Sequence, residues 1–158
     1  MTLKGNLVDF AEQGKFDVIV HGCNCFHTMG AGIAKEIATR YPDAYLIDKQ
    51  YTDKGDRIKL GGYTNVLVTA PNGNKFTIVN AYTQYYYGRP KKGTGPVVDY
   101  TALETAFRTI ATNYKHLRIG YPKIGAGLAG GDWHIIEAII NKELINCVYH
   151  ELVIINKA

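Results

Sequence analysis

Two glycine-rich segments have the composition of loops that bind phosphate through their backbone. The first is Met29–Ala34 (MGAGIA), and the second is Ile124–Gly130 (IGAGLAG). Each follows a short apolar run and precedes a segment of helical period. Glycine lets backbone N–H groups turn toward an anion, and the N-terminus of a helix adds a partial positive charge. Because the chain has two such segments, we expect a diphosphate held from both sides.

Neither segment matches a more widespread nucleotide-binding motif. No Gly-Lys-Ser/Thr follows either of them, so neither is a P-loop. Gly125–Gly130 spells GxGxxG, but it lies in the last third of the chain, and no acidic residue ends a second strand about 20 positions on. This position argues against a Rossmann dinucleotide site.

Three polar side chains close to these segments could take part in catalysis. His21 and Asn24 follow the apolar run Phe16–Val20, and Asp132 follows the second glycine-rich segment. The imidazole of histidine titrates near neutral pH, which suits His21 to proton transfer. Each residue also has a purely structural interpretation. His21 could be a hydrogen-bonded histidine at the end of a strand, and Asp132 could be the N-cap of a helix.

The cysteines do not predict a disulfide framework or a metal site. Cys23, Cys25 and Cys147 are too few for a full set of disulfides and are interpreted as reduced thiols of a cytoplasmic protein. His21, Cys23, Cys25 and His27 alternate along the chain, so in an extended conformation they would point to opposite faces. We therefore expect neither a metal nor a cofactor.

Composition and charge favour one globular domain with an anionic ligand. The chain has 158 residues, of which 46% are hydrophobic and 20% charged, which excludes collagen, a coiled coil and a disordered chain. The net charge of +4 suits an anionic ligand but is far from that of a polycation. No apolar run approaches the ~18 residues that would span a membrane. We expect one domain over residues 1–158, in a cytoplasmic monomer without a membrane partner.

Strands and helices alternate along the chain, which predicts an α/β fold whose largely parallel sheet is covered on both faces. Strands are predicted over residues 16–20, 61–70, 75–82, 117–121 and 152–155. Helices are predicted from Ile33 until Pro42, and after the N-caps Asp99 and Asp132. Residues 83–98 have no period, as is typical of a ligand-facing loop, and at least one of Tyr85–Tyr87 is expected to be exposed, as a lid. Ligands of such folds bind outside the carboxyl ends of the strands.

Four segments, in this order, resemble the macro domain family over essentially the whole chain. They are Gly5–Leu7, Asp17–Asn24, Met29–Ala34 and Pro122–Gly130. The resemblance implies a three-layer α/β/α sandwich with a mixed, largely parallel central sheet, and ADP-ribose as the small-molecule ligand.

The resemblance also implies which residues contact ADP-ribose. Asn6 and Leu7 would contact adenine, Asn24 the distal ribose, and Asn156 the proximal ribose or adenine. Asn6 stands where the family usually has Asp, so its selectivity for adenine is expected to be softer. The implied contacts are Asn6, Leu7, Gly22, Cys23, Asn24, Met29, Gly30, Ala31, Gly32, Ile33, Ala34, Ile124, Gly125, Ala126, Gly127, Leu128, Ala129 and Asn156.

The string from His21 to Ala34 is similar to the branch that includes phosphatases of ADP-ribose 1″-phosphate and glycohydrolases of terminal ADP-ribose. The glycohydrolases use a Lys after the middle strand and an Asp in the second loop, whereas this chain has Asn80–Tyr82 and Ala129 there. The phosphatase-like branch has a His before the Cys-Asn string, and His21 matches it, so the resemblance implies hydrolysis of ADP-ribose 1″-phosphate to ADP-ribose and phosphate with His21 and Asn24 as catalytic residues. Because the sequence has no metal cluster, we expect this hydrolysis to be metal-independent. Asp132 is a further catalytic candidate because it directly follows the second glycine-rich segment. Two alternatives stay open: a non-catalytic reader of ADP-ribose, and a hydrolase that removes ADP-ribose from a partner protein or nucleic acid.

Overall fold

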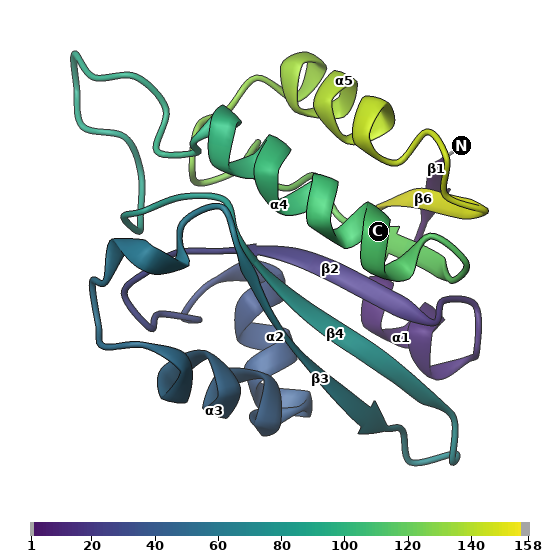
Figure 1. Cartoon of the computed structure of the whole chain (residues 1–158). Helices are drawn as coiled ribbons and strands as arrows, with labels where there is room; N and C mark the ends of the chain where they lie inside the picture. The colour runs from purple at the N-terminus through teal and green to yellow at the C-terminus, as the bar shows by residue number, and fades with distance from the viewer. Residues whose placement is uncertain (1, 156–158) are drawn as a thin grey trace.

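Six strands form one mixed sheet, in the spatial order β1-β6-β5-β2-β4-β3. The structure is a computed structural model, in which residues 2–155 are described (Figure 1). Every neighbouring pair is parallel except β3 and β4, which form an antiparallel hairpin. The strands are β1 (Thr2–Lys4), β2 (Val18–Cys23), β3 (Tyr63–Thr69), β4 (Lys75–Tyr82), β5 (Arg118–Tyr121) and β6 (Tyr149–Ile154).

Helices cover both faces of the sheet, as predicted. Figure 1 shows α4 and α5 on one face and α1, α2 and α3 on the other. The helices are α1 (Leu7–Glu12), α2 (Gly32–Arg40), α3 (Pro42–Tyr51), α4 (Tyr100–Tyr114) and α5 (Trp133–Glu143), with a 3₁₀ turn η1 (Arg57–Lys59). The prediction of a three-layer α/β/α fold is confirmed. In the part of the chain that the structure describes, no helix has the length and apolar character needed to cross a bilayer.

Strand β2 lies at the centre of the sheet and is buried on both faces. Val18 and Val20 belong to the core under α4 and α5, whereas Ile19 belongs to the core over α1, α2 and α3. The period of two along a strand then puts His21 on the same face as Ile19. A continuous apolar run is what a strand with two covered faces requires.

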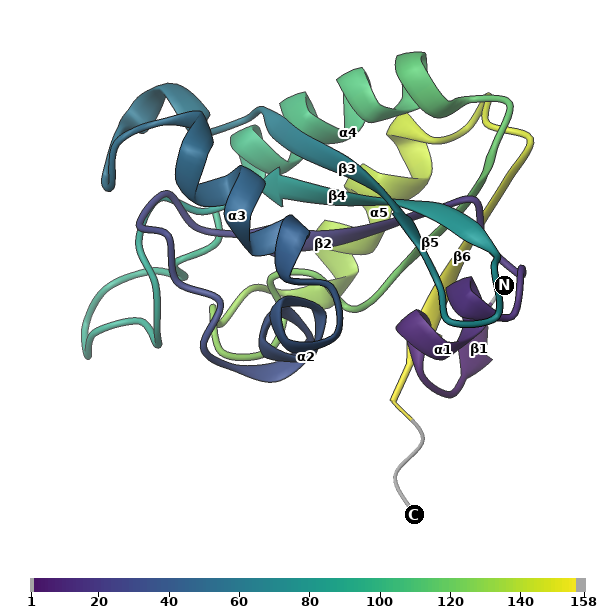
Figure 2. The same cartoon turned by 90° about the horizontal axis from the view of Figure 1, so that it is seen from below.

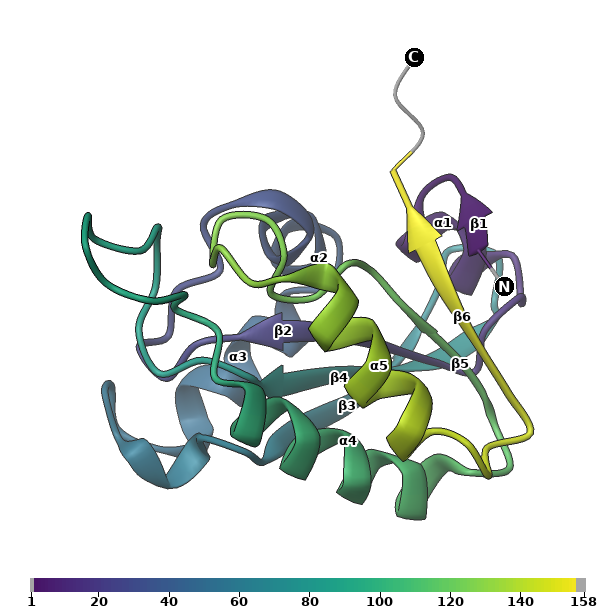
Figure 3. The ribbon, with the colours of Figure 1, turned by 90° about the horizontal axis from the view of Figure 1, so that it is seen from above.

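The parallel strands bring both glycine-rich segments to one edge of the sheet. β2 is parallel to β4 and to β5, so the segments that follow these three strands all begin at the carboxyl edge. We name residues 24–31 the first loop and residues 122–131 the second loop. Figures 2 and 3 show the two loops close to each other beside α2. The arrangement expected for a diphosphate site is thus present.

Several boundaries differ from the prediction, for identifiable reasons. Strand β2 continues to Cys23 because its last residues pair with Ala81 and Tyr82 of β4. Pro42 ends α2, as predicted, but it also begins α3, because proline at the first helical position lacks only a hydrogen bond that is unmade there anyway. The short elements β1 and α1 carry too little periodicity to be recognised from sequence.

A buried ion pair holds η1 against α3 near the carboxyl edge. The ammonium group of Lys59 donates to the Oδ1 atom and the backbone oxygen of Asp48, at 2.8 and 2.9 Å. The hydroxyl of Tyr82 donates to the same Oδ1 at 2.7 Å. Both charged side chains are almost fully buried. The pair positions the segment before η1, where the N–H of Gly55 donates to the carbonyl of Cys25 in the first loop.

We expect Lys59→Met to destabilise the protein by about 3 kcal/mol or more, because it leaves the Asp48 carboxylate buried without its counter-charge. Urea unfolding at pH 7.5 measures this loss. Lys54→Met, at an exposed position of the same segment, is the control and should change stability by less than about 0.5 kcal/mol. Equal stability of the two variants would show that the ion pair contributes nothing.

Candidate functional site

The first loop leads into a helix whose N-terminus has no side-chain cap. Ala31 is the N-cap of α2, and no side chain accepts a hydrogen bond from the first turn. Gly30 and Gly32 are exposed, and a Cβ atom built on either would meet nothing within 4 Å. Gly32 has φ +54, a backbone conformation that favours glycine. No side chain among the described residues therefore accepts from the N–H groups of the first turn of α2, which leaves them available to an anion.

Asn24 and Met29 fix the rest of the first loop. The amide of Asn24 donates to the hydroxyl of Thr28 at 2.7 Å and to its backbone oxygen at 3.1 Å. The Oδ1 atom of Asn24 accepts from the N–H of Phe26 at 2.8 Å. Met29 is buried against Cys23 and Tyr82. The loop is thus held at both ends, and Asn24 lies at the carboxyl end of β2, where it was predicted.

The second loop presents unpaired backbone donors. Among the described residues, the N–H groups of Gly127, Leu128 and Ala129 have no hydrogen-bond partner. Gly127 and Leu128 are exposed, and a Cβ on Gly127 would meet nothing within 4 Å. In contrast, a Cβ on Gly125 would lie 2.7 Å from the side chain of Val98. Gly125 therefore serves close packing, and Gly127 lies where a ligand can approach the backbone.

Two of the remaining predicted contacts, Gly22 and Ile124, pack against each other and form the floor below the two loops. Gly22 belongs to β2, and a Cβ there would clash with Ile124 at 2.8 Å and with Thr83 at 2.9 Å. Ile124 is itself buried in the core. Ile33, Ala34 and Ala126 are partly buried, at the start of α2 and in the second loop.

Residues 83–99 connect the two loops, which the sequence did not reveal. The N–H of Cys25, in the first loop, donates to the carbonyl of Tyr85 at 3.0 Å. The N–H of Val97 donates to the carbonyl of Ala129, in the second loop, at 2.9 Å. This segment therefore closes one end of the candidate site.

An aromatic cluster forms the part of residues 83–99 nearest the first loop. The ring of Phe26 lies 4.9, 4.8 and 5.8 Å from the rings of Tyr85, Tyr86 and Tyr87. The last two tyrosines stack on each other and are 51% and 43% exposed. The expectation of an exposed tyrosine is confirmed. The run of three tyrosines indicated this exposure from the sequence. Their contact with Phe26, which is distant along the chain, could not be inferred from it.

His21 lies inside the sheet, below the candidate site. Because β2 runs on to Cys23, His21 is not at the end of the strand as predicted, and its side chain is fully buried. Its Nε2 atom is 2.6 Å from Oδ1 of Asn80, whose amide nitrogen donates to Thr64 and Ala44. The Asn80 oxygen must then be the acceptor, so Nε2 carries the proton. This geometry favours a positioning role over direct contact with a ligand.

Burial also determines the charge of His21. It lowers the pKa of the imidazole below its ordinary value, although the hydrogen bond to Asn80 and the charge of Asp48 oppose the shift. The ring is therefore neutral at neutral pH.

Asp132 is exposed and caps α5, as the structural interpretation predicted. Its Oδ1 atom accepts from the N–H of His134 at 2.9 Å. Its own N–H donates to the hydroxyl of Tyr100 at 3.0 Å. The second carboxylate oxygen has no partner among the described residues, so it is free to act at the second loop.

The predicted adenine contacts lie at the start of α1. Asn6 is its N-cap: Oδ1 accepts from the N–H of Asp9, and the amide nitrogen donates to Glu36 on α2, both at 2.8 Å. Leu7 is buried, so only its backbone could meet a ligand. Asn156 lies outside the described residues.

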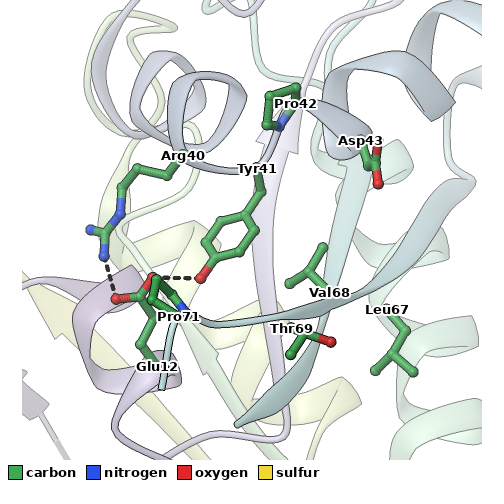
Figure 4. Close-up of a pocket in the computed structure, with 9 residues that line it drawn as sticks. All are labelled: Glu12, Arg40, Tyr41, Pro42, Asp43, Leu67, Val68, Thr69 and Pro71. Atoms are coloured by element: carbon green, nitrogen blue, oxygen red, sulfur yellow. Dashed lines mark hydrogen bonds and ion pairs between the residues drawn. The ribbon is translucent and has the colours of Figure 1, made fainter. Parts of the chain in front are cut away.

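A hollow of about 730 Å³ lies at the opposite edge of the sheet (Figure 4). It lies where α1, α2 and β3 end, away from both loops. Arg40 and Tyr41 in its wall both bond to Glu12. The lining residues are Glu12, Arg40, Tyr41, Pro42, Asp43, Leu67, Val68, Thr69 and Pro71. The unpaired backbone donors of the candidate phosphate site lie at the other edge, so this hollow is separate from them.

We expect His21→Gln to destabilise the protein by about 1–3 kcal/mol at pH 7.5, because it disturbs a buried hydrogen bond. Burial lowers the pKa of His21 below its ordinary value of 6.5, so at acid pH the unfolded wild-type chain binds more protons at this residue than the folded protein does. Wild-type stability therefore falls as the pH is lowered below 6.5, and the deficit of the variant should be smaller at pH 5.5 than at pH 7.5. Urea unfolding at both pH values measures it, with the exposed His116→Gln as control. A constant deficit would mean that the folded protein protonates His21.

Comparisons with known proteins agree with this geometry. No protein-family model matches the chain. An uncharacterized 17.5 kDa protein from the tk-vs intergenic region of Enterobacteria phage T4 is 36% identical over 143 residues, covering 88% of this chain and 86% of that protein. An ADP-ribose 1″-phosphate phosphatase of Debaryomyces hansenii is 28% identical over 163 residues, covering 89% of this chain and 91% of that protein. The macrodomain of Thermus aquaticus DarG shares the fold, with a TM-score of 0.71 at 18% identity over 99% of this chain and 97% of that chain. The fold, the two loops and these relatives together show that the chain belongs to the macro domain family.

Proposed function

We propose that the protein binds ADP-ribose across the carboxyl edge of the sheet and hydrolyses ADP-ribose 1″-phosphate. One observation carries the binding: unpaired backbone donors lie in the segment that follows β2 and in the segment that follows its neighbour β5. The donors at the start of α2 take one phosphate, and those of Gly127–Ala129 take the other.

The phosphatase named among the relatives supports the choice of reaction. A water oxygen attacks the 1″ phosphorus, the bond from phosphorus to the 1″ oxygen breaks, and phosphate and ADP-ribose result. The attacking water loses a proton, and the leaving 1″ oxygen gains one. The site must therefore supply a group that accepts a proton and a group or water that donates one.

The geometry separates the roles of the three catalytic candidates. Asp132 has a free carboxylate oxygen beside the second loop, so it is the group proposed to accept the proton of water. Asn24 holds the first loop, and its Oδ1 keeps a second lone pair for a ribose hydroxyl. His21 is buried and neutral, so its proposed role is to hold the end of β2 through Asn80.

A non-catalytic reader of ADP-ribose is the second candidate. The burial of His21 supports it, because binding needs only the two loops, whereas catalysis would depend on Asp132 to accept the proton. Removal of ADP-ribose from a protein or nucleic acid is the third candidate function. The exposed Tyr86 and Tyr87, followed by the basic stretch 89–92, would then face the attached partner.

We expect Gly127→Val to reduce affinity for ADP-ribose by roughly tenfold or more, because its side chain occupies the space of the phosphate and blocks charge-assisted hydrogen bonds. The Cβ atom meets nothing in the protein, so the melting temperature should stay the same. Isothermal titration calorimetry measures the affinity. Gly95→Val, at an equally open glycine of residues 83–99, is the control. Unchanged affinity in Gly127→Val would exclude the second loop from the site.

We expect the wild-type protein to release phosphate from ADP-ribose 1″-phosphate, and Asp132→Asn to lower kcat by about 10²–10⁴, the usual cost of losing a positioned base. Asparagine still caps a helix, so the fold is kept. Asp99→Asn, at the cap of α4, is the matched control and should keep full activity. Tight binding of ADP-ribose without phosphate release by the wild type would identify a reader. Full activity of Asp132→Asn would remove Asp132 from the mechanism.

A further inference from the structure

Strand β3 forms one edge of the sheet and has a free outer side. It is the last strand in the spatial order and pairs only with β4 (Figure 1). The backbone groups on the outer side of an edge strand have no ladder partner, and another strand can pair with them. Which groups these are follows from the hydrogen bonds at the two ends of the hairpin.

The odd-numbered residues of β3 turn their backbone groups to the free side. The N–H of Ala70 donates to the carbonyl of Asn74, and the N–H of Tyr82 donates to that of Gly62, so even-numbered residues bond toward β4. In an antiparallel ladder these residues alternate with residues whose N–H and C=O groups point away. Among the described residues, nothing bonds to the outward backbone groups of β3, which belong to Tyr63, Asn65, Leu67 and Thr69.

This edge lacks the features that keep most edge strands from pairing with another chain. Protected edges are short, or carry a lysine, a proline or a bulge. The opposite edge of the sheet is protected in this way, because β1 has three residues and ends in Lys4. In contrast, β3 has seven residues and pairs with β4 without a bulge, and residues 61–70 contain neither a charged residue nor a proline. Strand β3 is therefore open to pairing along its whole length.

We propose that two copies of the chain pair through β3 in antiparallel orientation and form a dimer with one continuous sheet. The proposal replaces the monomer expected from the sequence, and it does not rest on the proposed function. Like charges that lie opposite each other destabilise a strand pair. Two copies of an uncharged strand meet without this repulsion, which favours a second copy as the occupant of the edge.

One antiparallel register pairs all seven residues of both strands. It puts Val66 opposite Val66 of the partner subunit and Asn65 opposite Leu67 of the partner subunit, with Tyr63 opposite the partner's Thr69. The residues with free backbone groups then lie opposite one another. Each such pair exchanges two hydrogen bonds, so the register satisfies the groups that the isolated chain leaves unpaired.

The side chains of β3 also fit this register. Leu67 is 63% exposed, although it is apolar. Its diagonal neighbours across the new ladder are Leu67 and Tyr63 of the partner subunit, which cover part of its surface. Val66 lies on the other face of the sheet, partly buried against the core over α1, α2 and α3. There it meets its own symmetry mate, and two β-branched side chains form a favourable cross-strand pair.

Sedimentation velocity across a concentration series tests the dimer. We expect the wild-type protein to form a dimer and Leu67→Lys to raise the dissociation constant of the dimer by about tenfold or more, because two ammonium groups then face each other diagonally. Ile145→Lys, at an apolar residue that is 73% exposed after α5, is the matched control and should leave the dimer unchanged. Far-UV circular dichroism should show that both variants fold. A wild-type monomer throughout the series, or a dimer that Leu67→Lys does not weaken, overturns the proposal.

Disulfide cross-linking tests the register. In Val66→Cys the two thiols occupy a pair whose Cα atoms are about 4.5 Å apart, which is within the range of a disulfide. Oxidised glutathione should therefore link this variant into a covalent dimer on a non-reducing gel. Thr69→Cys, the control, lies opposite Tyr63 of the partner subunit and should stay at the wild-type background, to which Cys147 also contributes. A protein that sediments as a dimer but gives no cross-link in Val66→Cys pairs through another surface, which overturns the proposal.

Discussion

The parallel pairing of β2 with both of its neighbours is the constraint on which the site depends. It places the end of β2 between the ends of β4 and β5 and makes the three following segments share one edge. Because these segments start side by side, the side chains below them must be small or closely fitted. Gly22, with Ile124 and Thr83 against it, meets that requirement. The donors above this floor are backbone groups, which need no side-chain rotamer to be fixed before a ligand binds.

Below the edge, a connected set of buried polar side chains crosses the sheet. It runs from the ion pair of Lys59 and Asp48 through Tyr82 and Thr64 to Asn80 and His21. Burying a polar group costs free energy unless it is hydrogen-bonded, and here the bonds that link these side chains are 2.6 to 3.0 Å long. Such a set has few alternative arrangements, so it fixes the register of β2 against β4. The histidine that suggested catalysis thereby becomes part of what holds the first loop in place.

The elements with the strongest patterns could be predicted from the sequence. The N-caps Asp99 and Asp132, the hairpin of β3 and β4 and the two glycine-rich loops all depend on neighbouring residues, and all are present. Features set by distant residues could not be predicted. The position of His21 depends on how far β2 pairs with β4. The hydrogen bonding of the Asn6 amide depends on Glu36, which is 30 residues away along the chain. Caps and turns can be predicted from neighbouring residues, whereas the ends of strands and the partners of side chains depend on residues that are distant along the chain.

The segment of residues 83–99 has a consequence for how the site responds to a ligand. Its backbone is bonded to the first loop at Tyr85 and to the second loop at Val97. The two loops therefore do not fluctuate independently. In the proposed binding mode, a phosphate bound to one loop would also restrict this segment, and the other loop would then lose less conformational entropy when it bound the second phosphate. A ligand with two linked phosphates would therefore bind more tightly for two reasons. Its phosphates are joined to each other, and the two loops that would hold them are joined by residues 83–99.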